Sequence, residues 1–299
     1  MIENNMQKNW SVTQAYFWAG KHLTSHDIPA PFAEAEYLLA YTIKCEKKDI
    51  LKLHDKVLQE DEIKKFKEVI DRRVKREPSQ HIIGEEEFWG LNFKVTPDVL
   101  IPRPETQLLV KEALKEARAY EPDPSKLILD ICTGSGCIAV CMSLELKKSQ
   151  IYAVDISEKA LEVARENAKR HGVDKRLTFL QGDLLHPIEP LGLKGKVDMV
   201  LSNPPYVSKK MVDILQPEIK HYEPMLAVAG GEDGFDYYRR VIPESAKYLK
   251  PGGSLILEIG YGQTDGTVAL LEQEKVFEGI EIKKDFAEID RVIKAKLVS

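Results

Sequence analysis

The sequence has none of the features that mark membrane, secreted or metal-binding proteins. No apolar run in its 299 residues approaches the ~18 residues that span a bilayer, and residues 1–8 lack the apolar core of a signal peptide. The four cysteines show no C-x-x-C spacing, and no histidine cluster accompanies them. We therefore expect a cytoplasmic protein with reduced cysteines, no membrane association and no metal site.

Positive charge is not in excess either. Lysine and arginine number 43 against 48 aspartates and glutamates, which gives a net charge of −5. Proteins whose main affinity is for nucleic-acid phosphates usually carry a basic face. We therefore expect no direct nucleic-acid partner, although a local basic patch stays open. The length allows one large domain or two ordinary ones, and we take a monomer as the default state.

Apolar residues with helical spacing predict a compact helical unit over residues 1–78. The clearest helix covers 62–76, where Ile63, Phe66, Ile70 and Val74 form one apolar stripe. Lysine and arginine fill its other face, which is either a solvated surface or a docking surface for a partner. This unit has no catalytic constellation of residues.

The pattern then changes twice. Residues 79–98 form short alternating runs punctuated by glycine, which predicts a β-hairpin linker. Residues 99–299 alternate strand and helix, which predicts an α/β domain with a parallel sheet covered on both faces. The expected strands are Lys126–Ile131, Ile151–Val154, Arg176–Leu180, Val197–Ser202 and Leu255–Ile259, followed by an antiparallel edge hairpin over 276–283 and 289–298.

A glycine-rich turn follows the first of these strands, over Asp130–Ala139. Glycines there let a ligand approach the backbone closely, and the next helix offers free N–H groups. The pattern also fits a dinucleotide fingerprint, with Asp155 bound to a ribose hydroxyl, or a turn built only for tight packing. Asp183 ends the third strand, where it is either a ligand for an adenine amino group or a turn-former.

The tetrapeptide Asn203-Pro204-Pro205-Tyr206 follows a buried strand and is the feature around which the chain is organised. Its prolines remove two backbone donors, so the loop presents carbonyl oxygens and few N–H groups. The asparagine adds another oxygen, and the tyrosine adds a flat face. Several fixed acceptors beside an aromatic plane suit a planar –NH2 group, and a hydride-transfer enzyme has no need of them.

These motifs together resemble the seven-stranded, Rossmann-like S-adenosylmethionine-dependent methyltransferases, whose Asn/Asp-Pro-Pro-Tyr members methylate planar nitrogens. More narrowly, the chain resembles the HemK/PrmC protein-glutamine N5-methyltransferases, which modify the glutamine of the Gly-Gly-Gln loop in class I peptide chain release factors. The likeness runs from about residue 70 to the end through the blocks Ile101–Thr106, Asp130–Ala139, Asn203–Val207, Glu223–Ala227, Gly230–Gly234, Glu258–Gln263, Lys284–Asp285 and Asp290–Val292.

The resemblance implies a role for each part of the chain. Residues 1–78 would dock the release factor, 79–98 would link, and 99–299 would catalyse. The implied residues for S-adenosylmethionine are Cys132, Thr133, Gly134, Ser135, Gly136, Asp155, Asp183, Leu184 and Asn203. Those for the substrate are Asn203, Pro204, Pro205, Tyr206, Arg103 and Glu105, with Asn203, Pro204 and Tyr206 catalytic.

An amide nitrogen is a poor nucleophile, so the chemistry depends on positioning. We expect the Asn203 Oδ1 atom and the Pro204 carbonyl to accept the two amide hydrogens and orient the nitrogen. They would also stabilise positive charge as it develops there. The Tyr206 ring would pack flat on the amide and exclude water.

The chain departs from the family pattern at four positions. Cys132 and Glu288 stand where glycine is usual or common, Gln107 where glutamate is usual, and His81 where tyrosine is usual. Cys132 contributes mainly backbone and should be tolerated, whereas Gln107 removes a charge near the proposed pocket.

Four other functions stay open. An adenine-N6 methyltransferase of nucleic acid uses a similar tetrapeptide, but it must unstack its base and hold a charged backbone. Glutamine methylation of a ribosomal protein differs only in the docked partner. A non-catalytic scaffold would bind the cofactor without transfer, and a dehydrogenase would bind a nicotinamide cofactor instead.

Overall fold

The computed structural model describes residues 10–119 and 124–298. The chain divides into two compact units, Met1–Gly84 and Glu85–Ser299, each of which is described by itself. Residues 1–9, 120–123 and 299 lie outside the described ranges. Within those ranges, no helix combines the length and the apolar character needed to cross a membrane.

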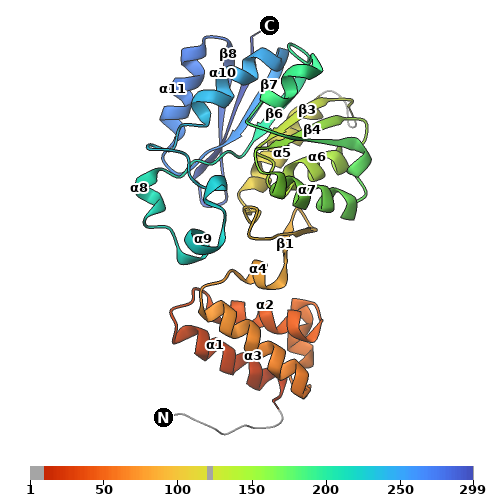
Figure 1. Cartoon of the computed structure of the whole chain (residues 1–299), viewed down its shortest axis with the longest axis vertical. Helices are drawn as coiled ribbons and strands as arrows, with labels where there is room; N and C mark the ends of the chain where they lie inside the picture. Colours follow the sequence, from red (N-terminus) through yellow and green to blue (C-terminus); the bar gives the residue numbers. More distant parts are fainter. Residues whose placement is uncertain (1–9, 120–123, 299) are drawn as a thin grey trace. The chain divides into compact units, whose positions relative to one another are not determined.

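The first unit is helical, as its sequence predicts (Figure 1). Three helices pack around a core in which Leu38, Phe66 and Ile70 are fully buried. A capping box begins the first helix, because Ser11 and Gln14 satisfy each other's backbone N–H groups. The elements are α1 (Val12–Thr24), α2 (Pro31–Ile43), η1 (Lys47–Leu53), α3 (Glu60–Val74) and α4 (Ser79–Ile83).

The basic run on α3 is partly used inside this unit. The Arg73 side chain is buried and its Nε atom donates to Glu34 at 3.1 Å. The Lys65 ammonium lies 4.3 Å from the Tyr41 ring centroid, a favourable cation–π distance. Some of the basic side chains on this face of α3 therefore make contacts within the helical unit.

Residues 79–83, which the sequence analysis assigns to the hairpin, form the short helix α4 instead. A run of five residues is too short for its periodicity to separate helix from strand. Gly84, at φ 85°, ends the helix in the left-handed region. The hairpin itself is present as β1 (Glu85–Phe88) and β2 (Leu91–Lys94), joined by Trp89 and Gly90, both at positive φ.

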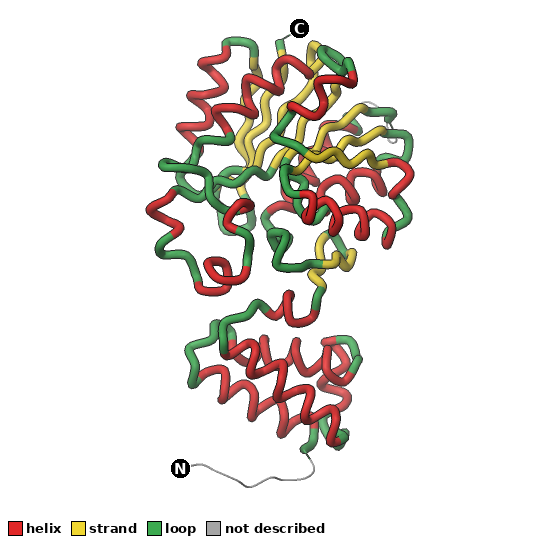
Figure 2. Tube along the Cα trace, in the orientation of Figure 1, coloured by secondary structure: helices red, strands yellow, loops and turns green. Residues whose placement is uncertain are grey.

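The second unit contains the predicted seven-stranded sheet, in the order β5-β4-β3-β6-β7-β9-β8. Strands β3 to β7 are parallel, and β9 runs antiparallel to both of its neighbours. Figure 2 shows the strands as one sheet with helices on both sides. The strands are β3 (Leu127–Ile131), β4 (Gln150–Asp155), β5 (Leu177–Gln181), β6 (Val197–Ser202), β7 (Leu249–Glu258), β8 (Phe277–Lys284) and β9 (Asp290–Leu297).

Alternating residues of each strand face two separate cores. Ile128 faces the core that α5, α6 and α7 cover, whereas its neighbour Leu129 faces the core of α10 and α11. The helices are α5 (Thr106–Ala117), α6 (Cys137–Glu145), α7 (Glu158–Arg170), α8 (Lys209–Val212), α9 (Pro217–Tyr222), α10 (Tyr238–Tyr248) and α11 (Thr264–Glu274). The short 3-10 segments are η2 (Asp174–Arg176), η3 (His186–Leu191) and η4 (Met225–Ala227).

Ser157 caps α7, since its hydroxyl accepts from the Ala160 N–H at 3.2 Å. Strand β7 begins at Leu249 and not at Leu255. The segment between them contains Pro251 and two glycines, and a register shift against β6 accommodates it.

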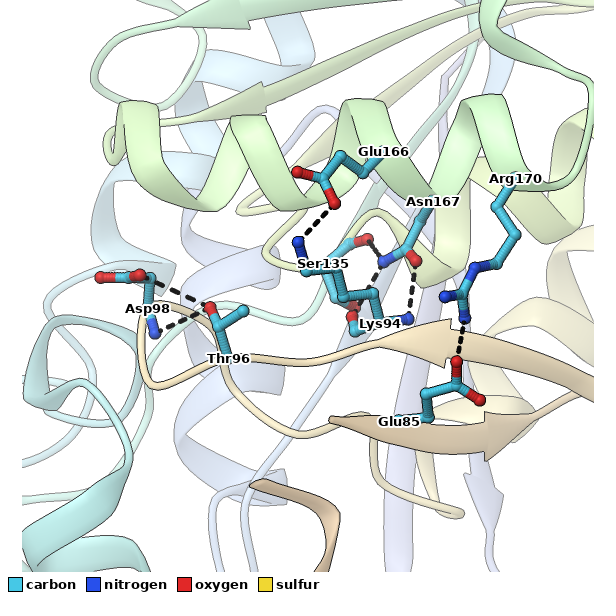
Figure 3. A network of polar contacts seen from close by, with 8 residues as sticks. All are labelled: Glu85, Lys94, Thr96, Asp98, Ser135, Glu166, Asn167 and Arg170. Atoms are coloured by element: carbon cyan, nitrogen blue, oxygen red, sulfur yellow. Dashed lines mark hydrogen bonds and ion pairs between the residues drawn. The ribbon is translucent and has the colours of Figure 1, made fainter. Parts of the chain in front are cut away.

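Asn167 on α7 ties the hairpin to the turn after β3 (Figure 3). Its Oδ1 atom accepts from the Lys94 N–H at 2.7 Å, and its Nδ2 atom donates to the Lys94 and Ser135 carbonyls at 3.0 and 2.9 Å. The Asn167 side chain is fully buried, so each of these groups depends on it for a partner. An ion pair between Arg170 and Glu85 at 2.9 Å also links α7 to the hairpin.

Replacing Asn167 should therefore be costly. We expect Asn167→Ala to lower the free energy of unfolding by about 2–3 kcal/mol, because buried polar groups left without partners cost ~1–3 kcal/mol each. The neighbouring Glu166, whose carboxylate pairs with Lys94 and is 57% exposed, supplies the control. Glu166→Ala should cost under ~1 kcal/mol in the same urea titration. Equal losses from the two variants would contradict this role for Asn167.

Candidate active site

A cleft lies at the carboxyl ends of the parallel strands. Strand β3 has β4 on one side and β6 on the other, so the order of the strands reverses there, which is where open α/β sheets bind ligands. The cleft opens to solvent and is lined mainly by apolar side chains with a few polar groups, the composition typical of small-molecule sites. Its lining includes Val99, Arg103, Thr106, Cys132, Thr133, Gly134, Ser135, Asp155, Ile156, Asp183, Leu184, Asn203, Pro205, Leu226 and Tyr237.

The turn after β3 is shaped by three residues in the left-handed region. Cys132, Gly134 and Gly136 have φ values of 63°, 55° and 79°. A Cβ atom on Gly134 would meet no atom of the described residues within 4 Å, so this backbone is open on the cleft side. A Cβ atom on Gly136 would lie 3.0 Å from the Ala164 Cβ atom, so glycine there allows α6 to pack against α7.

Two carboxylates hold this turn. Asp155, at the end of β4, accepts from the Gly134 and Ser157 N–H groups, both at 2.9 Å. Burial raises the pKa of Asp155 above its usual value. Asp130 is fully buried beneath the turn and accepts from the Thr133 hydroxyl at 2.6 Å. Burial raises the pKa of Asp130 to about 7.

Asp183 and Leu184 enter the cleft from the loop after β5. The Asp183 Oδ2 atom accepts from the Arg240 guanidinium at 2.5 Å. This ion pair is half exposed, so it anchors the carboxylate while leaving an oxygen for a further donor. Tyr237, beside Arg240 in the sequence, lines the same part of the cleft.

Asn203 forms the wall of the cleft at the end of β6. Its Nδ2 atom donates to the Thr106 Oγ1 atom at 3.1 Å, so its Oδ1 atom remains an acceptor for a ligand. Ser202, immediately before it, donates its hydroxyl proton to the Ile131 carbonyl at 2.7 Å and is fully buried. This bond joins the ends of β6 and β3, and with them the Asn203 wall and the glycine-rich turn.

Tyr206, the last residue of the tetrapeptide, does not line the cleft. Its hydroxyl lies 3.4 Å from the Glu258 Oε1 atom, and its carbonyl accepts from the Gln263 Nε2 atom at 3.0 Å. Two glycines pack closely against Tyr206. A Cβ atom on Gly230 would lie 2.6 Å from the Tyr206 Cα atom, and a Cβ atom on Gly260 would lie 2.9 Å from the Tyr206 Cδ2 atom. The loop is therefore clamped in one conformation.

A buried ion pair holds the segment before α5. The Arg103 guanidinium donates to Glu223, and the other Glu223 oxygen accepts from the Ile101 N–H at 3.0 Å. The Glu223 side chain is only 1% exposed, so both of its oxygens are used inside the protein. The carboxylate of Glu223 thus fixes Arg103 at the rim of the cleft.

The cleft brings together most of the residues that the sequence singles out, from the turn after β3 to Asn203 and Arg103. It leaves Gly136, Pro204, Tyr206 and Glu105 outside its lining. Four residues without a predicted role hold the predicted ones in place: Thr106, Glu223, Glu258 and Gln263. These four lie within the quoted blocks, but only their contacts reveal what they do.

Comparison with known proteins follows the same division of the chain. Residues 14–84 match the family model described as the PrmC N-terminal domain, and residues 104–231 match the methyltransferase small domain. A release factor glutamine methyltransferase of Geobacter sulfurreducens is 38% identical over 88% of this chain and 89% of its own. One from Rhodopirellula baltica is 34% identical over 98% of both chains.

Among solved structures, a methyltransferase from Pyrococcus furiosus matches with a TM-score of 0.50 and 15% identity, over 77% of this chain and 98% of its own. This likeness concerns the fold alone. The fold and the matched families define the protein as an S-adenosylmethionine-dependent methyltransferase. The relatives, similar over nearly their whole length, narrow this further: the chain belongs to the release factor glutamine methyltransferase family.

The residues present fit this cofactor. Gly134 leaves an open cradle in which a side chain would intrude, and Asp155 and Asp183 offer acceptors at the ends of adjacent strands. Hydroxyl and amino groups are the donors that such acceptors bind. Apolar walls, Ile156 and Leu184 among them, complete the cleft.

Two glycines provide a matched test of the cradle. Gly134 and Gly252 both have positive φ, and neither would bring a Cβ atom within 4 Å of the protein, but only Gly134 lines the cleft. We expect Gly134→Ala and Gly252→Ala each to lower the unfolding free energy by about 1–2 kcal/mol through backbone strain. Only Gly134→Ala should weaken S-adenosylmethionine binding, by about tenfold or more (~1.4 kcal/mol). Calorimetric titration measures this difference, and equal affinities for the two variants would exclude the cradle.

Proposed function

We propose that this enzyme methylates the side-chain amide nitrogen N5 of the glutamine in the Gly-Gly-Gln motif of class I peptide chain release factors. The relatives carry the name release factor glutamine methyltransferase. The observation that carries the proposal is the hydrogen bond from the Asn203 Nδ2 atom to Thr106, which leaves the oxygen of this cleft-lining side chain as an acceptor for a ligand. An acceptor at this position suits the –NH2 group of a carboxamide.

The cofactor, when bound, supplies an electrophilic methyl group on a sulfonium. We assign its binding to the turn Cys132–Gly136 and to Asp155, Asp183, Leu184 and Asn203, because all but Gly136 line the cleft. The Cys132 thiol stays neutral, since burial raises its pKa. It therefore does not compete as a nucleophile for the methyl group.

The substrate amide needs orientation more than activation. Asn203 Oδ1 and the Pro204 carbonyl would accept its two hydrogens, holding the nitrogen towards the methyl group. Pro205 has no N–H group, so no backbone donor competes at this point of the loop. As the nitrogen forms its new bond it gains positive charge, which the same acceptors stabilise until its extra proton is lost to solvent.

Residues outside the cleft lining hold the tetrapeptide in place through Tyr206. Tyr206 is clamped by Gly230, Gly260 and Gln263, so its position fixes the carbonyls before it. The flat packing of its ring on the substrate amide stays a prediction. Arg103, held by Glu223 at the rim, would contact the substrate chain, whereas Glu105 lies outside the cleft lining.

The helical unit is the part of the chain that we propose docks the release factor, with 1–78 as docking domain, 79–98 as linker and 99–299 as catalytic domain. The match of residues 14–84 to the PrmC N-terminal domain supports this division. A modifier of translation factors works in the cytoplasm, the location that we propose. We also propose that it acts as a monomer and contacts neither nucleic acid nor membrane.

Asn203→Ala tests the site. We expect methyl transfer to a purified release factor to fall below detection by mass spectrometry, because the amide loses its main acceptor. The affinity for S-adenosylmethionine should fall by no more than ~1–3 kcal/mol, the value of one hydrogen bond to a ligand group. Asn92→Ala, which changes an exposed asparagine of β2, should leave both quantities unchanged.

Near-normal turnover by the Asn203 variant would contradict the mechanism. Transfer by the unaltered enzyme to a ribosomal protein or to DNA, but not to the release factor, would replace the substrate while keeping the site. Tight cofactor binding without transfer to any of them would favour a scaffold.

A further inference from the structure

Glu258 is a fully buried carboxylate behind the tetrapeptide, and the mechanism above gives it no role. It ends β7 and is 1% exposed. Its Oε1 atom lies 3.4 Å from the Tyr206 hydroxyl, and its Oε2 atom has no partner of good hydrogen-bond geometry among the described residues. Burying a carboxylate is costly, so its presence here calls for a function.

Thr106 connects this carboxylate to Asn203. The Thr106 side chain is 3% exposed, and its Oγ1 atom accepts from the Asn203 Nδ2 atom at 3.1 Å. Its hydroxyl lies close enough to Glu258 to lower the pKa of that carboxyl, against the effect of burial. Glu258, whose Oε2 atom has no partner among the described residues, is therefore the acceptor within reach of the single Thr106 proton.

A hydroxyl has one proton, and this decides how Asn203 is turned. While Thr106 donates to Glu258, its oxygen can only accept from Asn203. The Asn203 NH2 group then faces Thr106, and its oxygen faces the cleft. If Thr106 donated to Asn203 instead, the amide would turn over and present its NH2 group to the substrate NH2 group, a contact between two donors.

We infer that Glu258 and Thr106 are positioning residues that hold the Asn203 amide with its oxygen, and not its NH2 group, towards the substrate nitrogen. This inference rests on the proposed function. The Tyr206 hydroxyl, which meets the same carboxylate, ties the other end of the tetrapeptide to the same anchor. One buried carboxylate thus orients the acceptor and fixes the loop that carries it.

The ionised form of Glu258 is the one that can accept from both hydroxyls. The pKa of Glu258 is raised to about 7, because burial and the Glu105 carboxylate, which raise it, outweigh the Thr106 and Tyr206 hydroxyls and Arg291, which lower it. Tyr238 and Cys137, both close enough to feel its charge, are kept neutral by burial. As pH falls through about 7 the carboxyl becomes a donor, so methyl transfer should fall on the acid side.

The first experiment compares Thr106→Val with Thr106→Ser in the full-length enzyme, using a purified release factor, S-adenosylmethionine and methyl counting by mass spectrometry. Valine keeps the shape but removes the hydroxyl, so kcat should fall by about ten- to a hundredfold, the scale of a misplaced catalytic group. Serine restores the hydroxyl and should recover most of this loss. The Kd for S-adenosylmethionine and the melting temperature should be similar in both variants.

The second experiment follows kcat against pH. The unaltered enzyme should show an acid limb near pH 7. Tyr206→Phe should keep the limb but move it to higher pH, because the Tyr206 hydroxyl lowers the pKa of Glu258. Glu258→Gln should lose the limb because an amide does not titrate. If Glu258→Gln does not fold, the comparison of Thr106→Val with Thr106→Ser still tests the inference. Equal kcat for the valine and serine variants, or an unchanged acid limb in Glu258→Gln, would overturn the inference. Absence of transfer by the unaltered enzyme would instead overturn the proposed function.

Discussion

A hydrogen bond between two short side chains, Asn203 and Thr106, sets the geometry on which the rest of the site depends. The two residues lie 97 positions apart in the chain, one at the end of β6 and one at the start of α5. Ser202, next to Asn203, also bonds the end of β6 to the end of β3. The glycine-rich turn follows β3, so the cofactor side and the substrate side of the cleft share one rigid edge.

Buried carboxylates recur around this edge, and each holds a different part of it. Asp130 lies under the glycine-rich turn, Asp155 binds its backbone, Glu223 fixes the segment with Arg103, and Glu258 lies beside the Tyr206 hydroxyl. Each fixes polar groups that would otherwise move, at the cost of its own desolvation. These carboxylates accept hydrogen bonds from groups of the protein itself. The acceptors of the tetrapeptide are then left to bind the substrate.

Much of this architecture can be predicted from the sequence. The strand-helix alternation gives the parallel sheet, and Asp130–Ala139 and Asn203–Tyr206 fall at strand ends, where the cleft lies. The helix α4 was missed because five residues carry too little periodicity. The partners Thr106 and Glu258 were missed because a hydrogen bond between distant positions leaves no local pattern in the chain.

Two departures from the family pattern have a clear physical meaning in the structure. Cys132 and Glu288, which stand where glycine is usual or common, have φ values of 63° and 60°. The backbone thus keeps the left-handed conformation that favours glycine, at a cost of roughly 1–2 kcal/mol for each residue. The turn after β3 depends on backbone shape, and that shape is retained with cysteine.

The central claim is that the site recognises both hydrogens of a carboxamide through fixed acceptors. The most direct measurement is the affinity of the enzyme, loaded with S-adenosylmethionine, for a release factor and for the same factor with glutamate in place of the Gly-Gly-Gln glutamine. Glutamate has the same shape but brings oxygens against the Asn203 and Pro204 oxygens. The account predicts at least tenfold weaker binding of the glutamate form (~1.4 kcal/mol), and equal binding of the two forms would contradict it.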